Sequence, residues 1–147
     1  MSTDTTTRQR GRGGTRITRA LGDSSAEVGE AWTSLQRSAG ADMPQMGLAA
    51  GERPAADVEV LAGAFAVAEY ELARRMHAAQ ASGCLPFPGP GSMLTARSWS
   101  TPTSRRLARA GALAAEHPDL AAVWASGVIT SEHVDAVARQ ADLFTAD

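Results

Sequence analysis

Three arginines close together in the chain, Arg105, Arg106 and Arg109, are the residues whose type and spacing point most directly to chemistry. They follow Thr101 and Pro102, a pair that predicts the start of a helix because a threonine hydroxyl caps free amides and proline fits the first helical position. At 100° per residue, Arg105 and Arg109 lie opposite the apolar side of this helix, and Arg106 lies on its flank. Guanidinium groups displayed outward in this way suit the binding of phosphate oxygens.

This arrangement is unfavourable for the helix by itself. Like charges four residues apart repel by about 0.3 kcal/mol, and a cation near a helix N-terminus opposes the dipole by roughly 0.3 to 1 kcal/mol. Residues 72–115 contain six arginines and no acid, although the whole chain has a net charge of −2. Two interpretations stay open: the arginines contact nucleic acid, or they solubilise a face and pair across space with the acids of 24–71 or 116–147.

The segment before the arginines sharpens the first interpretation. Residues 92–99 predict two short turns, and a connection at 100–103 then leads into the arginine helix. This is the order of a helix-turn-helix, whose second helix enters the major groove of DNA. The residues predicted to lie nearest the DNA are Thr103, Arg105, Arg106 and Arg109, together with Arg97.

Residues that could catalyse a reaction or hold a metal are scattered. His77, His117 and His133 each lack a partner at a metal-ligand spacing, and the single cysteine, Cys84, cannot build a zinc site. For His133 a capping or hydrogen-bonded role is the simpler expectation. The chain has no lysine, which excludes a Walker-type phosphate loop. We therefore expect no catalytic residues, no metal, no cofactor and no small-molecule substrate.

The composition indicates which elements must position these residues. The chain has 147 residues, of which 30 are alanine and only 24 are Leu, Ile, Val or Phe. Alanine favours helices but contributes little burial. We therefore expect Trp32, Trp99 and Trp124 to fill much of the core. No alternating strand pattern is present, so the predicted class is all-α.

The chain divides into three segments. Residues 1–23 form a basic tail without apolar periodicity, for which we expect disorder. Residues 24–54 contain a helix, opened by a capping box of Ser24 and Glu27 and ended by Gly40, followed by a linker.

Residues 55–147 form the predicted helical domain. It begins with one long helix, 55–81, whose apolar stripe runs from Val58 to Ala79. A proline-rich loop, the arginine helix to about 115, a short helix ended by Gly127 and a last helix capped by Thr130 or Ser131 follow. The prediction is a helical bundle with a helix-turn-helix-like C-terminal half. Because no apolar run has the length of a signal peptide or a membrane span, we expect a cytoplasmic protein without membrane contact.

Two phrases carry a family resemblance over roughly 58–144: VEVLAGAFAVAEYELARRMHAAQASG and ARAGALAAEHPDLAAVWASGVITSEHVDAVA. They resemble the actinobacterial domain of unknown function 222, also called the 13E12 repeat family, a helical domain commonly N-terminal to HNH endonuclease modules. The most telling positions are Leu113, Pro118, Gly127, Ile129, Ser131 and His133. The second phrase is also similar, more distantly, to the DNA-binding part of ParB-type partition proteins.

The resemblance implies association with a nuclease, but the nuclease module itself is missing. A histidine-asparagine-histidine site requires asparagine, and the chain contains none. We therefore expect a non-enzymatic module, a truncated product or a short relative, that contacts DNA and positions a nuclease supplied elsewhere. The alternative is a protein-interaction or self-assembly module, homo-oligomeric or not, that uses the 58–79 stripe and binds no nucleic acid.

Overall fold

The computed structural model describes residues 19–40, 52–84 and 89–144, and these residues form helices without any strand. The predicted all-α class is therefore confirmed. The chain divides into two compact units, 1–46 and 47–147. Within the residues that are described, no helix has both the length and the apolar composition needed to cross a bilayer.

Unit 1 contains helix α2 (Ala26–Ala39), preceded by helical residues 19–23. The predicted tail therefore includes a helical end, while residues 1–18 lie outside the described residues. The predicted capping box is wrong. Ser25, not Ser24, is the N-cap, and its side chain makes no cap bond. The Ser24 hydroxyl donates to the Leu21 carbonyl at 3.0 Å. No residue of α2 is buried.

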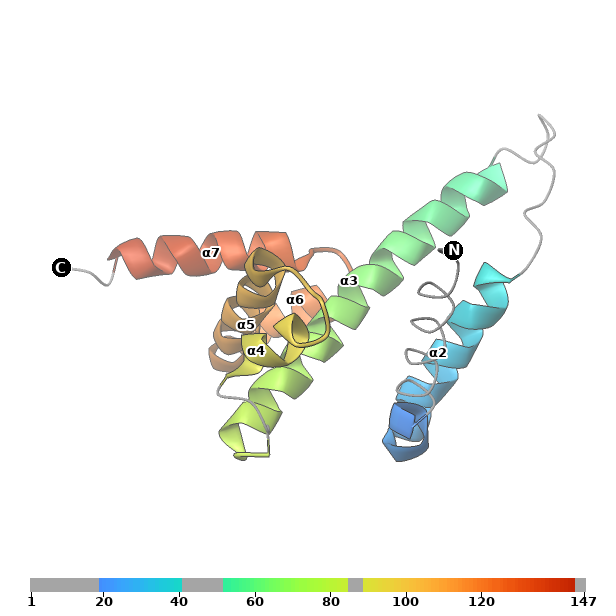
Figure 1. Cartoon of the computed structure of the whole chain (residues 1–147). Coiled ribbons are helices and arrows are strands. Elements are labelled where there is room, and N and C mark those ends of the chain that lie inside the picture. Colours follow the sequence, from blue (N-terminus) through green and yellow to red (C-terminus); the bar gives the residue numbers. More distant parts are fainter. Residues whose placement is uncertain (1–18, 41–51, 85–88, 145–147) are drawn as a thin grey trace, which may run out of the picture. The chain divides into compact units, whose positions relative to one another are not determined.

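Unit 2 holds the remaining helices of the described residues (Figure 1). In chain order they are α3 (Glu52–Ala81), α4 (Pro90–Thr95), α5 (Thr101–Glu116), α6 (Pro118–Ala125) and α7 (Ser131–Phe144). Helix α5, the predicted arginine helix, is the centre of this unit and contacts all four of the others. Its contacts with α3 and α7 are the most extensive. Despite this central position, one side of α5 stays exposed, including Arg105 and Arg109.

The core of unit 2 is small and rests on a few large side chains. Leu107 of α5, Trp124 of α6 and Val134 of α7 are fully buried, and Ala73 and Met76 of α3 complete the cluster. A full-size hydrophobic side chain contributes about 1.5 to 3 kcal/mol on burial, several times what a methyl group gives. Trp124 also meets Tyr70 edge-to-face, with ring centroids 5.5 Å apart.

The tryptophan predictions have mixed outcomes. Trp124 is completely buried, as expected, and Trp32 is partly buried within unit 1. The prediction for Trp99 is wrong, because 42% of it is exposed. Trp99 lies after α4 in a tight turn through Ser98, whose φ of 68° is left-handed, and this turn leaves the indole outside the core.

Two glycines allow the helices of unit 2 to approach closely. A Cβ on Gly111 would lie 2.9 Å from the Ala73 carbonyl oxygen, so only glycine lets α5 lie this near α3. Gly127 has a φ of +81°, and a Cβ there would meet the Gly63 carbonyl oxygen at 2.9 Å. The turn after α6 therefore requires glycine for both its backbone conformation and its contact with α3.

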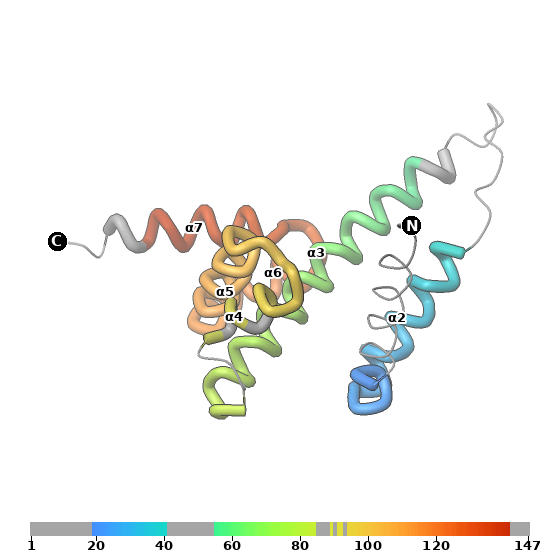
Figure 2. The backbone as a smooth tube through the Cα atoms, in the orientation of Figure 1, coloured from blue at the N-terminus to red at the C-terminus, as the bar shows by residue number. Residues whose placement is uncertain are grey.

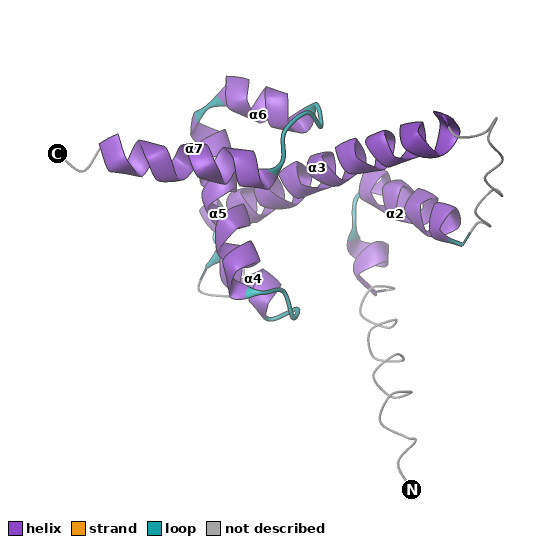
Figure 3. Cartoon of the chain, turned by 90° about the horizontal axis from the view of Figure 1, so that it is seen from above, coloured by secondary structure: helices purple, strands orange, loops and turns teal. Residues whose placement is uncertain are grey.

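Helix α3 has two parts with different surroundings (Figure 2). The buried side chains of its second part are Ala66, Glu69, Ala73 and Met76. Of these four, only Met76 belongs to the predicted stripe. Before Gly63 the helix extends past the other helices of unit 2 (Figures 1 and 3), and residues 55–62 are all exposed. The predicted 58–79 stripe is therefore only partly covered: Met76 lies in the core and Leu72 packs against it, whereas Val58, Leu61 and Phe65 are exposed.

Candidate functional site

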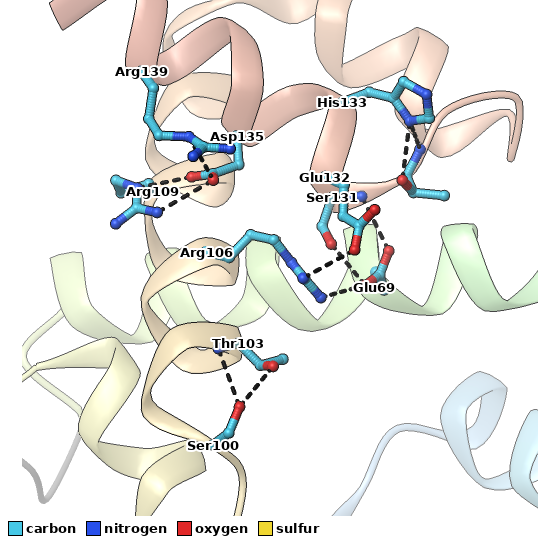
Figure 4. Close-up of polar contacts among 11 residues, drawn as sticks. Glu69, Ser100, Thr103, Arg106, Arg109, Ser131, Glu132, His133, Asp135 and Arg139 are labelled. Carbon is cyan, nitrogen blue, oxygen red and sulfur yellow. Dashed lines mark hydrogen bonds and ion pairs between the residues drawn. The ribbon is translucent and has the colours of Figure 1, made fainter.

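Two of the predicted DNA-facing arginines of α5, Arg106 and Arg109, lie beside carboxylates of α3 and α7 (Figure 4). Arg109 donates to Asp135 through Nε at 2.7 Å and through Nη2 at 3.2 Å. The Asp135 side chain is only 4% exposed and also pairs with Arg139 at 3.2 Å, one helical turn further along α7. Two cations therefore share one buried carboxylate, and the bidentate geometry fixes the direction of the Arg109 fork.

Arg106, nearly one turn before Arg109 on α5, is held in the same way by α7 and α3. Its Nη1 donates to Glu132 at 3.2 Å, and its Nη2 lies 3.8 Å from the Glu69 carboxylate. The Arg106 side chain is 27% exposed. The pairing of Arg106 and Arg109 across space with acids of 24–71 and 116–147 is therefore confirmed, and their contact with DNA stays a prediction.

Glu69 of α3 is, with Asp135, one of the two nearly buried acids of this cluster. Its side chain is 9% exposed, and its two oxygens accept from the backbone N–H of Ser131 at 3.0 Å and from the Ser131 hydroxyl at 2.7 Å. Ser131 is the first residue of α7, so a carboxylate from α3 caps the positive end of this helix dipole. This contact links two elements 62 residues apart.

The same helix end has a local cap. The Nδ1 atom of His133 accepts from the Thr130 N–H at 3.2 Å and lies 3.0 Å from the Thr130 hydroxyl. Histidine thus occupies the position that glutamate or glutamine takes in a capping box. The expected capping role of His133 is confirmed.

Thr103 belongs to the start of α5. The Ser100 hydroxyl accepts from the Thr103 N–H at 3.3 Å and bonds the Thr103 hydroxyl at 2.8 Å. The N-cap is therefore Ser100, one residue before the predicted Thr101. The first turn of α5 is satisfied internally, so Thr103 serves the helix start.

Arg97 and Arg105 differ from the other predicted contacts. Both are exposed, and neither makes an ion pair or hydrogen bond with another described residue. Arg74 and Arg75, also in the acid-free block, share Glu71. Hydrogen bonding from Arg74 at 2.8 Å, supported by Arg75 at 3.0 Å, lowers the pKa of Glu71 below its usual 4.5 despite partial burial.

A groove between α4 and α5 contains Arg105. It has a volume of about 480 Å³ and is lined by Gly91, Ser92, Thr95, Thr101, Ser104, Arg105, Ala108 and Arg109. No carboxylate belongs to this lining. Of the predicted site residues, the structure brings only Arg105 and Arg109 together here.

The residues weighed for catalysis remain apart. Cys84 is exposed, and no group of three or more His, Cys, Asp or Glu side chains within the described ranges is arranged to hold a metal ion. His77 lines a separate small cavity of about 130 Å³ next to Trp124.

Sequence reasoning missed Glu69 and Asp135 as the carboxylates that hold the arginines. One signal was available for Asp135: it lies four residues before Arg139 on the last predicted helix and beside the buried Val134. Glu69 gave no such signal, because its partner is 62 residues away.

The chain matches no protein-family model, and comparison with curated proteins and with solved structures found no similar protein. The resemblance to the 13E12 repeat family therefore stays a prediction.

Proposed function

We propose that this chain is a protein-interaction module that binds a partner helix along the first part of α3. The observation that supports this most strongly is an exposed apolar row on that helix. Val58, Leu61 and Phe65 recur at helical spacing and are 67%, 50% and 63% exposed. Exposed apolar side chains that are contiguous mark interaction sites, whereas isolated ones are ordinary.

The charges around this row indicate the kind of partner. Asp57 and Glu59 are exposed on the same part of α3, and no arginine follows them before Arg74. Exposed alanines at 62 and 64 leave room for a second helix to approach the backbone. The occupant that fits is an amphipathic helix of another protein, with an apolar stripe flanked by basic residues.

Two synthetic helical peptides test this proposal. Both carry the same leucine stripe, one flanked by arginine and the other by glutamate, and fluorescence anisotropy measures binding to the full chain. The basic peptide should bind and the acidic one should not. Leu61→Ser with Phe65→Ser should weaken binding by at least about tenfold, since each side chain loses more than about 1 kcal/mol of burial.

Val137→Ser is the matched control, because Val137 is 49% exposed on α7, away from the row. It should leave the dissociation constant unchanged. Equal binding of both peptides, or of neither, would overturn the proposal. A mass that rises with concentration in sedimentation, and that the double variant abolishes, would replace the foreign helix with a second copy of this chain.

DNA contact remains a second candidate, and the unpaired Arg97 and Arg105 favour it. It ranks second because residues 47–147 carry eight arginines and eleven acids, a net charge of −3. Binding of a nonspecific duplex across a salt series tests it. If Arg105 contacts a phosphate, Arg105→Ala should reduce the salt slope by about one, and an unchanged slope would remove this role.

A nuclease partner is supported by the family resemblance alone. We include it in the proposal only as one protein that could carry the basic helix.

A further inference from the structure

Three residues that can donate hydrogen bonds through their side chains line the groove between α4 and α5: Ser92, Thr101 and Arg105. None of these side chains bonds to another residue that the structure describes. Neighbouring hydroxyls are already engaged: Ser104 donates to the Ser100 carbonyl at 2.9 Å, and Thr95 donates to the Gly91 carbonyl at 3.1 Å. The donors without a described partner therefore come from both helices, Ser92 from α4 and Thr101 and Arg105 from α5.

The charge in this groove is uniformly positive. Arg105 and Arg109 both line it, and Arg109 is turned toward Asp135, which lies outside the lining. Arg106, the neighbour of Arg105, is instead directed at Glu132 and Glu69. Arg105 is thus the arginine of α5 whose charge no carboxylate of the described chain offsets.

We infer that this groove binds a phosphate group, with Arg105 as the charged donor and the hydroxyls of Ser92 and Thr101 as neutral donors. A guanidinium fork and hydroxyls match the geometry of phosphate oxygens, and a site without carboxylates avoids repelling the dianion. A volume of about 480 Å³ exceeds that of inorganic phosphate, so an ester can also enter. The inference does not depend on the interaction surface of α3.

Nuclear magnetic resonance titration of the full chain with inorganic phosphate tests the site. Saturable shifts are expected at the backbone amides of Ser92 and Thr101 and at the Arg105 Nε, and chloride at equal ionic strength should not produce them. Arg105→Gln should weaken binding by about tenfold, the usual loss when a charge-assisted bond is removed. Arg97→Gln is the control, since Arg97 is exposed but does not line the groove.

Shifts that are not saturable, or that Arg97→Gln and Arg105→Gln reduce equally, would overturn the inference. A second arm identifies the source of the phosphate. If a duplex shifts the same resonances and inorganic phosphate competes with it, the groove binds the phosphate backbone of nucleic acid. If only free phosphate and a small phosphate monoester bind, the site belongs to a small ligand, and DNA contact fails while the groove assignment stands.

Discussion

At the scale of single residues, the carboxylates decide what the arginines can do. Arg106 and Arg109 project from α5, but Glu132, Glu69 and Asp135 receive them. A guanidinium bound to a nearly buried carboxylate is costly to withdraw, because the acid would be left desolvated without a partner. These two arginines therefore hold α7 and α3 against α5.

Glu69→Gln should lower the free energy of unfolding by about 2 kcal/mol, the range for a hydrogen bond to a charged group. The amide keeps the shape of the side chain but removes the charge that faces Ser131 and Arg106. Urea unfolding followed by circular dichroism measures the change. Glu71→Gln is the control, because its exposed pairs with Arg74 and Arg75 contribute at most about 1 kcal/mol. Equal losses for the two variants would contradict the role assigned to Glu69.

Glu71 also gives a prediction for pH. Its pKa in the folded state is lowered, so its pairing with Arg74 and Arg75 stabilises the fold above the unfolded value of 4.5. This contribution is lost as the pH falls through the lower, folded pKa. The small stability difference between the wild type and Glu71→Gln should therefore shrink below pH 4.5 and be constant at neutral pH. Denaturant unfolding at a series of pH values measures this stability difference. A difference that grows on acidification would contradict the lowered pKa of Glu71.

At the scale of elements, the packing of α5 on α3 depends on the absence of a side chain at Gly111. Gly111→Ala should lower the free energy of unfolding by about 1 to 3 kcal/mol, because the new Cβ would lie 2.9 Å from the Ala73 carbonyl oxygen. Thermal unfolding measures this loss.

Gly63→Ala is the matched substitution on α3. Its Cβ would have its nearest neighbour, the Gly127 carbonyl oxygen, at 3.9 Å, an ordinary contact. The higher helix propensity of alanine should raise the stability by about 0.5 to 1 kcal/mol. No change at Gly111 would show that the close approach of α5 to α3 is described wrongly, and a loss at Gly63 would show the same for the contact between α3 and the Gly127 turn.

The elements themselves were largely predictable, and their boundaries and faces were less so. The starts of α5 and α6 were predicted to within a residue from Thr101, Pro102 and Pro118, because proline and hydroxyl caps act locally. The buried face of α3 could not be read from its stripe. Alanine at 66 and 73 and a buried Glu69 form that face, and their burial depends on helices that come later in the chain.

In the candidate site, contacts between residues close in sequence were predictable and contacts between distant residues were not. The capping role of His133 was predictable because Thr130 lies three residues before it. The exposed Arg105 was also predicted. The ion pairs of Arg106 and Arg109 join residues 26 apart, and their geometry follows from how α7 packs on α5, which no local pattern encodes.

At the scale of the whole molecule, unit 2 has its own core. Its buried side chains come from α3 to α7, and α2 contains no buried residue. A chain of residues 47–147 should therefore unfold cooperatively with a thermal midpoint within a few degrees of that of the full chain. Differential scanning calorimetry of both chains checks this, and non-cooperative melting of the shorter chain would show that unit 1 is needed for the core.

The bond between Glu69 and Ser131 also has a consequence for the order of events during synthesis. The carboxylate emerges from the ribosome 62 residues before the amide that it will cap. Helix α7 therefore cannot acquire this cap until Ser131 has been made and the start of α7 lies beside α3, a contact of long sequence separation that is slow to form. Helical signal from α7 should then report completion of the bundle, and a nascent chain stalled before Ser131 would leave the Glu69 carboxylate with Arg106 as its partner but without the Ser131 N–H and hydroxyl.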